Sequence, residues 1–273
     1  MKPAVAGCVG VLAAANVLNN RIARRWAPVT SAVATGTLLV VARRAGLTWH
    51  ELGFRDARAG AVTGGALAAA VAAGYAAGVA LPRTRPLFKD QRALALSRRR
   101  VLEEALVQVP FGTVLLEEVG FRGVLPALLG RVMPARAAVA GSAALFGLWH
   151  VLPALDMARA NPALGRLTAG ETPAEAAGPV DPERPVRAGR GRAGHGLRTG
   201  GPEAGRPAEA GRLVAGTVVS TAVAGLGFHA LRHRAGLLAP ALLHLATNSL
   251  GYAAARVASR LDQPSRGSAR PVR

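Results

Sequence analysis

The hydrophobic residues of this chain occur in long blocks, not at the spaced positions of an amphipathic helix or strand. Ala, Val, Leu and Gly fill blocks of roughly 15–22 residues, and arginine-bearing stretches separate the blocks. A membrane-spanning helix needs about 20 consecutive apolar residues, whereas a soluble protein interleaves charges at the helical or strand period. The pattern therefore predicts an all-α fold, a polytopic transmembrane helical bundle of about seven to eight spans.

Seven spans are expected, with one polar segment between two of them and another after the last. Residues 156–211 are rich in Pro, Gly, Arg and Glu, which predicts a disordered polar loop, and residues 259–273 are expected to form a disordered basic tail. The first block reads as a span or signal anchor because it lacks a convincing small-residue cleavage site. The expected spans are residues 1–19, 29–42, 61–81, 101–129, 137–155, 213–231 and 237–255.

A net charge of +19 raises the question of a nucleic-acid partner, and the positions of the basic residues along the chain answer it. Residues 156–211 carry eight Arg and seven acids, so the excess lies in short loops beside the spans and in the tail. Basic loops of this kind are typical of positive-inside topology and favour anionic lipids as partners, with no nucleic acid. Loops 19–28 and 83–100 and the tail fall on one side, which the rule makes cytoplasmic, with the N-terminus outside. The expected location is the cell membrane.

Adjacent carboxylates interrupt the fourth apolar block. Glu117, Glu118 and Arg122 lie in residues 101–129, although an ionisable group at bilayer depth costs roughly 2.5–3.5 kcal/mol on insertion scales. Glu118 and Arg122 are an i,i+4 pair that can neutralise each other on a helix. Glu117 points about 100° away and has no local cation. A free, poorly solvated carboxylate of this kind is a candidate general base.

Other polar residues in apolar spans are candidate partners for Glu117. His150 lies four residues after Phe146, and His244 lies four before Asn248, so each pair shares a helix face. Lipid satisfies none of these polar groups, so we expect Glu117, His150, His244 and Asn248 to converge on one internal, water-accessible cavity. A lone buried histidine is more often structural than catalytic. His229 has no polar companion on its helix face, and we expect it to lie near the membrane interface.

Prolines flank these residues. Pro110 and Pro126 bracket the glutamates, and Pro153 and Pro240 lie near His150 and His244. Each can remove a backbone hydrogen bond, and we expect them to open the helices beside the site.

Three short motifs in this order resemble those of a known family. They are EExxxR at Glu117–Arg122, FxxxH at Phe146–His150 and HxxxN at His244–Asn248. Together they are similar to the CPBP intramembrane proteases, also called the CAAX-protease or Abi family, which include the Rce1-type prenyl-protein endopeptidases. The resemblance covers roughly residues 101–252. It implies one integral membrane domain over residues 1–273, with a catalytic core at 101–155 and 213–256.

The resemblance implies an intramembrane endopeptidase that hydrolyses a membrane-anchored protein or peptide with a glutamate-activated water. Glu117 is the general base, and His150 orients or polarises the water. His244 and Asn248 stabilise the oxyanion, while Arg122 holds Glu118 and Phe146 supports His150. Glu117, His150 and His244 are also a possible zinc set, but Asn248 is a poor zinc ligand, so we favour no cofactor.

Alternatives remain open at this point. His50-Glu51 begins like a zinc-binding HExxH motif, but Phe54 replaces the second histidine. No GxGD motif occurs, and Gly141-Ser142 is not followed by glycine as in rhomboid-like GxSG. A non-proteolytic scaffold or immunity-type membrane protein of the same fold, a proton-coupled transporter and a purely structural ion pair are the other hypotheses. Cys8 is the only cysteine, which excludes an intrachain disulfide.

Overall fold

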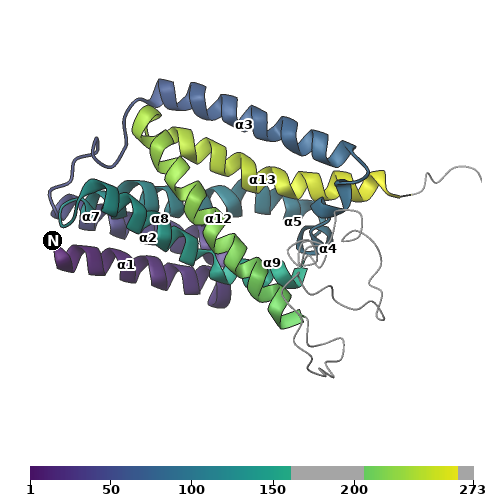
Figure 1. The fold of residues 1–273 in the computed structure, drawn as a ribbon, viewed down its shortest axis with the longest axis horizontal. Coiled ribbons are helices and arrows are strands. Elements are labelled where there is room, and N and C mark those ends of the chain that lie inside the picture. The colour runs from purple at the N-terminus through teal and green to yellow at the C-terminus, as the bar shows by residue number, and fades with distance from the viewer. Residues whose placement is uncertain (161–205, 264–273) are drawn as a thin grey trace, which may run out of the picture.

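The computed structural model describes residues 1–160 and 206–263, which form long helices without a strand (Figure 1). The predicted all-α class is therefore confirmed. Most helices run roughly along one direction, and α12 crosses the others diagonally. The long helices are α1 (Lys2–Val17), α2 (Ala27–Arg44), α3 (Ala57–Ala80), α8 (Ala135–Trp149), α9 (Val151–Ala160), α12 (Arg206–Ala235) and α13 (Leu238–Leu261). Shorter elements are η1 (Leu18–Ile22), η2 (Arg24–Trp26), η3 (Arg85–Phe88) and α4 (Gln91–Ala95).

One uninterrupted helix, here called the central helix (residues 98–129), joins five segments. Its parts are α5 (Arg98–Glu103), η4 (Glu104–Val114), α6 (Leu115–Glu118), η5 (Val119–Val124) and α7 (Leu125–Leu129), and both η segments have π-type hydrogen bonds. Pro110 lies inside η4, where the wider π turn accommodates its missing N–H. Pro126 lies in the first turn of α7. The expectation that these prolines open the helix is therefore corrected, since the helix continues through both.

The second half of the central helix is enclosed on every side. Residues 116–126 are buried without a break, as expected of a helix whose whole circumference faces other helices. Glycine permits this close packing, because a Cβ at Gly120 would lie 2.9 Å from a Leu12 methyl of α1. The carbonyl of Leu52 similarly lies 3.1 Å from the Cβ position of Gly123. The most enclosed stretch of the molecule therefore carries the two glutamates and the arginine.

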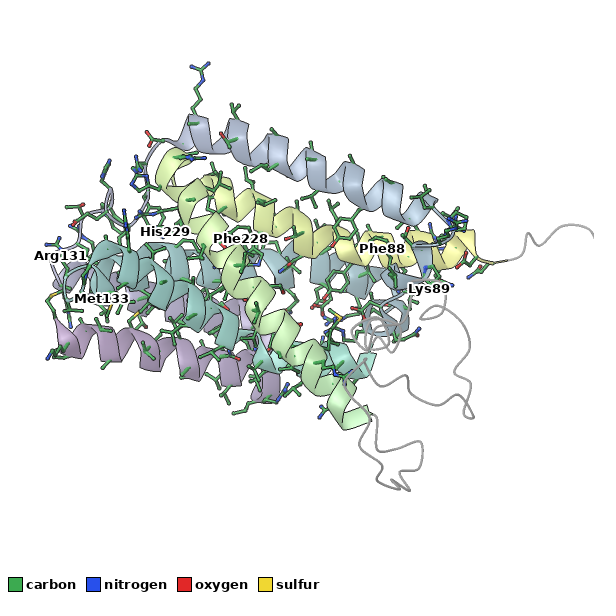
Figure 2. All side chains as sticks on the ribbon, viewed as in Figure 1. Phe88, Lys89, Arg131, Met133, Phe228 and His229 are labelled. Carbon is green, nitrogen blue, oxygen red and sulfur yellow. The ribbon has the colours of Figure 1, made fainter. Side chains whose placement is uncertain are left out.

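Loops gather at two ends of the bundle. Lys89 and Arg131 lie at opposite ends in Figure 2. At the basic end (residues 18–26, 81–97 and the end of α13), Arg85 and Lys89 pair with Asp262 at 2.9 and 2.5 Å. These hydrogen bonds hold the pKa of the Asp262 carboxyl below its ordinary 3.8. At the other end, the N–H of Leu237 donates to the carbonyl of Gly53 at 2.8 Å. The loop at residues 81–97 therefore lies beside the end of α13, and the side of the membrane on which these loops lie stays a prediction.

Four helices are long and apolar enough, by length and composition, to cross a membrane. They are Lys2–Ile22, Ala57–Ala80, Ala135–Arg159 and Ala210–Ala235. The central helix is interrupted by charges, and α2 and α13 do not meet the same criterion within the described residues. The number of spans, seven to eight, stays a prediction.

The predicted polar loop is shorter than expected. Helix α9 continues to Ala160 and α12 begins at Arg206, so both ends of the stretch 156–211 are helical. The predicted boundaries rested on the enrichment of this stretch in proline and glycine. Asp156 nevertheless lies in α9, where it forms ion pairs with Arg21 and Arg24 at 3.1 and 3.0 Å. The rest of the loop, 161–205, and residues 264–273 of the tail lie outside the described residues.

Helix α3 packs along α13 through a face of small residues (Figure 1). A Cβ at Gly64 would lie 2.8 Å from the carbonyl oxygen of Ala239 and 3.0 Å from the Leu242 Cβ. Gly65, the next residue, has no atom within 4 Å of its Cβ position. The lack of a side chain at Gly64 therefore permits the close approach of α3 to α13.

We expect Gly64→Ala to lower the stability of the protein in detergent by about 1–3 kcal/mol, because backbone of α13 would have to shift. The matched control is Gly65→Ala, which should be neutral or slightly stabilising because alanine favours a helix. Thermal unfolding followed by circular dichroism measures both. Equal stability of the two variants would contradict the close α3–α13 contact.

Candidate active site

Glu117 of α6 lies at the meeting point of the central helix, α8 and α13. Its carboxylate oxygen Oε1 accepts a hydrogen bond of 2.8 Å from the indole Nε1 of Trp149. The other oxygen, Oε2, is 3.7 Å from Nε2 of His244 and 3.9 Å from Nε2 of His150. The side chain of Glu117 is 3 % exposed. Three residues predicted to meet, Glu117, His150 and His244, therefore do so, and both imidazoles approach the same oxygen.

Glu118 occupies a different environment, although it is the neighbouring residue. Its Oε1 is 2.8 Å from Nδ1 of His244 and 3.5 Å from Nη1 of Arg122. Both partners are almost fully buried, as is Glu118. The predicted i,i+4 contact with Arg122 is present. His244 thus lies between the two carboxylates, one ring nitrogen facing each.

Arg122 is the largest fully buried side chain among the described residues. Its guanidinium carbon lies 3.7 Å from the ring centroid of Phe146 and 4.8 Å from that of Phe228. Such cation–π contacts are worth about 2 kcal/mol when desolvated. None of its nitrogen atoms has a hydrogen bond within the described structure. The positive charge of Arg122 is therefore held by Glu118 and by two aromatic faces.

Phe146 and His150 form one unit at the end of α8. Nδ1 of His150 lies 2.8 Å from the carbonyl oxygen of Phe146, and the two rings meet edge to face at 4.5 Å. A carbonyl oxygen only accepts, so Nδ1 carries a hydrogen, and in the neutral ring the lone pair is on Nε2. Nε2 is the ring nitrogen that faces Glu117.

Asn248 lies one turn after His244 on α13 and is half-buried. In the described part of the chain its side chain makes no hydrogen bond, so the structure does not bring it into contact with Glu117. Its neighbour Ser249 donates to the carbonyl of Ala105 in η4 at 2.8 Å. Asn248 is therefore on the element that borders the site, with its amide available.

Two site residues were not found from the sequence. Trp149 contacts Glu117, and Phe228 of α12 packs against Arg122 and, at 5.5 Å between ring centroids, against His244. Trp149 precedes the histidine of FxxxH and could have been considered because its indole needs a partner when buried. Phe228 lies in no motif, and no feature of the sequence indicates it.

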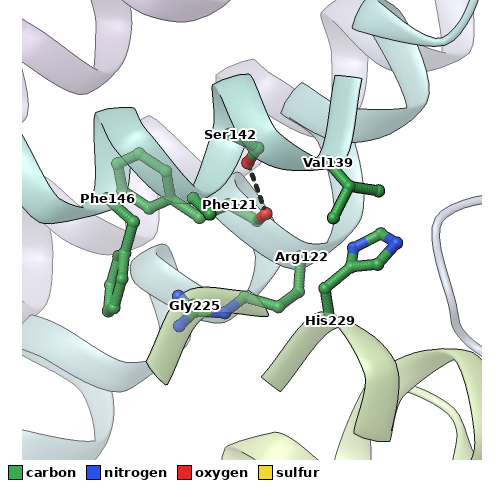
Figure 3. A pocket seen from close by; sticks show the side chains of 8 residues that line it. Phe121, Arg122, Val139, Ser142, Phe146, Gly225 and His229 are labelled. Atoms are coloured by element: carbon green, nitrogen blue, oxygen red, sulfur yellow. Dashed lines mark hydrogen bonds between the residues drawn. The ribbon is translucent and has the colours of Figure 1, made fainter. Parts of the chain in front are cut away.

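A narrow pocket borders the buried arginine on its other side (Figure 3). His229 and Arg122 both line it, whereas the sequence analysis placed His229 near the interface. Ser142 donates to the carbonyl of Phe121 at 2.7 Å across this region. The remaining lining residues are Phe121, Val139, Ala143, Phe146 and Gly225.

The proposed zinc ligands do not form a recognisable metal cluster. In the described residues, no group of three or more His, Cys, Asp or Glu is arranged to hold a metal ion. Glu117 Oε1 is occupied by Trp149, and Nδ1 of His244 by Glu118. The atoms left without these partners are Oε2 of Glu117 and the Nε2 atoms of His150 and His244.

A charged cluster enclosed among apolar helices is typical of a membrane protein with an internal polar site. The family model described as type II CAAX prenyl endopeptidase Rce1-like matches residues 104–250, which is more than half of the chain. The protein belongs to this Rce1-like family, and is therefore a membrane protease at the level of the family. The predicted CAAX-protease resemblance is confirmed. No curated protein and no solved structure matches the chain.

We expect Arg122→Met to lower the free energy of unfolding by about 3–5 kcal/mol, because it leaves Glu118 buried without its guanidinium. The double variant Glu118→Gln/Arg122→Met removes both charges and should recover a measurable part of this loss. Thermal unfolding in detergent compares the three proteins. If the double variant were no more stable than Arg122→Met, the pair would not be the source of the effect.

Proposed function

We propose that this protein is an intramembrane endopeptidase in which Glu117 activates the attacking water without a metal. The observation that carries the proposal is that Nε2 of His150 and Nε2 of His244 both approach Oε2 of Glu117, at 3.9 and 3.7 Å. These distances exceed a direct hydrogen bond but suit a water held between the three atoms.

The first step follows from the hydrogen-bonding capacity of each group. A water at this position donates one hydrogen to Glu117 Oε2 and the other to the lone pair of His150 Nε2. Its own lone pair is then free to attack a peptide carbonyl. Glu117 takes the proton as the new C–O bond forms, and the carbonyl π electrons move to oxygen.

The oxyanion needs donors, and the charges of the site favour His244 in this role. Glu117 and Glu118 carry two negative charges against one guanidinium. An imidazolium at His244 would make the cluster neutral, donating through Nδ1 to Glu118 and through Nε2 toward the reacting atoms. Asn248, one turn further along α13, supplies a neutral amide donor.

Collapse of the tetrahedral intermediate completes the reaction. The C–N bond breaks, its electron pair goes to nitrogen, and the proton held by Glu117 moves to that nitrogen. The products are a carboxylic acid and an amine, and Glu117 returns to its carboxylate form.

The substrate we propose is a membrane-anchored protein or peptide. The Rce1-like family is described as acting on prenyl CAAX proteins, so a prenylated C-terminal peptide is the first probe to test. The buried position of the site supports a substrate that reaches it from the bilayer.

We expect Glu117→Gln to lower kcat by roughly 10³-fold, since the amide cannot take a proton from water. Wild-type protein and the variant would be assayed in proteoliposomes on prenylated and unprenylated quenched-fluorescence peptides, with and without a zinc chelator. Glu103→Gln is the matched control, because Glu103 lies on the same helix and pairs with Arg100 away from the site. Its activity should be unchanged.

If the wild-type protein still cleaves the peptide in the presence of chelator, the metal-free reaction is supported. If chelator abolishes cleavage, the result instead supports a zinc site with Glu117, His150 and His244 as ligands. No wild-type cleavage of any peptide, with folded protein, would favour the scaffold hypothesis instead.

We also propose that the basic end contacts anionic lipid headgroups. Arg98 and Arg99 begin the central helix there and have no ion-pair partner in the described structure, unlike Arg100, which pairs with Glu103 and Glu104. A basic residue near a membrane surface contributes about 1 kcal/mol of attraction to anionic lipid.

Arg98→Gln/Arg99→Gln should therefore weaken binding of phosphatidylglycerol roughly 10- to 30-fold, as counted by native mass spectrometry. The control is Arg43→Gln/Arg44→Gln, which removes the same number of positive charges at the opposite end of the bundle. Equal losses in both double variants would contradict a lipid site specific to the basic end.

A further inference from the structure

The two oxygens of the Glu117 carboxylate have different surroundings. Oε1 receives the 2.8 Å hydrogen bond from Trp149, whereas Oε2 has no hydrogen bond within the described structure. Oε2 is also the oxygen that the His150 and His244 rings approach. A carboxylate is symmetric by itself, so the protein environment is what distinguishes the two atoms.

Trp149 is held firmly enough to impose this difference. It is the last residue of α8 and is 7 % exposed. Its indole meets the Phe121 ring edge to face at 5.4 Å, and its carbonyl accepts a 2.8 Å hydrogen bond from Asn16 of α1. Both the ring and the backbone of Trp149 are therefore fixed by groups outside the carboxylate.

We infer that Trp149 is a positioning residue: its indole N–H holds Oε1 of Glu117, so that Oε2 is the atom that takes the proton from water. The inference rests on the proposed role of Glu117 as general base. Without the indole donor, the carboxylate could turn about its terminal bond, and neither oxygen would stay directed toward the imidazoles.

The chain order strengthens this arrangement. Trp149 holds the base, and the next residue, His150, faces the water through Nε2. One turn at the end of α8 therefore delivers both groups to Glu117, and the Phe146 carbonyl fixes the tautomer of His150 from the preceding turn. A shift of this turn would move the donor and the imidazole together.

The test is Trp149→Phe, which removes the N–H and keeps an aromatic ring against Phe121. We expect kcat to fall roughly 10- to 100-fold with little change in KM, because a hydrogen bond to a buried charge is lost. Trp26→Phe is the control, because Trp26 is exposed at the basic end.

A kcat within twofold of wild type in Trp149→Phe would overturn the inference while leaving Glu117 as the base. If wild type cleaved no peptide, the proposed function would fail and the inference would fall with it.

A measurement independent of activity separates these cases and does not depend on the folding of Trp149→Phe. In protein carrying ¹⁵N-labelled tryptophan, the Trp149 indole resonance should lie downfield and shift when Glu117→Ala removes the acceptor. Trp26→Phe and Trp49→Phe assign the other two indole signals. A Trp149 signal insensitive to Glu117→Ala would show that the hydrogen bond does not exist.

Discussion

Burying two neighbouring carboxylates among apolar helices is the constraint on which this structure depends. A buried charge is stable only when other charges and hydrogen bonds replace its hydration. Here Arg122 comes from the same helix, whereas His244 and Trp149 come from distant parts of the chain, on α13 and α8. The bundle has to bring these helices together before the central helix can bury its polar residues.

The same constraint divides the work between the two glutamates. Successive residues on a helix point about 100° apart, so Glu117 and Glu118 meet different neighbours. Glu118 meets a guanidinium and an imidazole N–H, which fix it as a structural anion. Glu117 meets one neutral donor and otherwise keeps an oxygen uncommitted. A single backbone step therefore separates a carboxylate paired with two basic side chains from one that keeps an uncommitted oxygen, and His244 lies between the two.

Much of this organisation could be predicted from the sequence, and the failures have physical causes. The apolar blocks predicted the helices. Polar residues are conspicuous in apolar spans, so the motifs identified Glu117, Glu118, Arg122, His150 and His244. Trp149 and Phe228 were missed because an aromatic residue in an apolar block looks like ordinary packing. Pro110 was misjudged, since the local rule that proline breaks a helix ignores the wider π turn that accommodates it.

The contacts of α1 have a consequence for how the boundaries of this protein should be understood. The family match begins at residue 104, yet Leu12 packs against Gly120 and Asn16 holds the backbone of Trp149. A fragment cut at the edge of the match would keep every motif and expose one flank of the central helix. Proteins that share the motifs but differ in their first helix would have the same reactive groups in different dielectric surroundings. The packed unit is thus larger than the segment by which the family is identified.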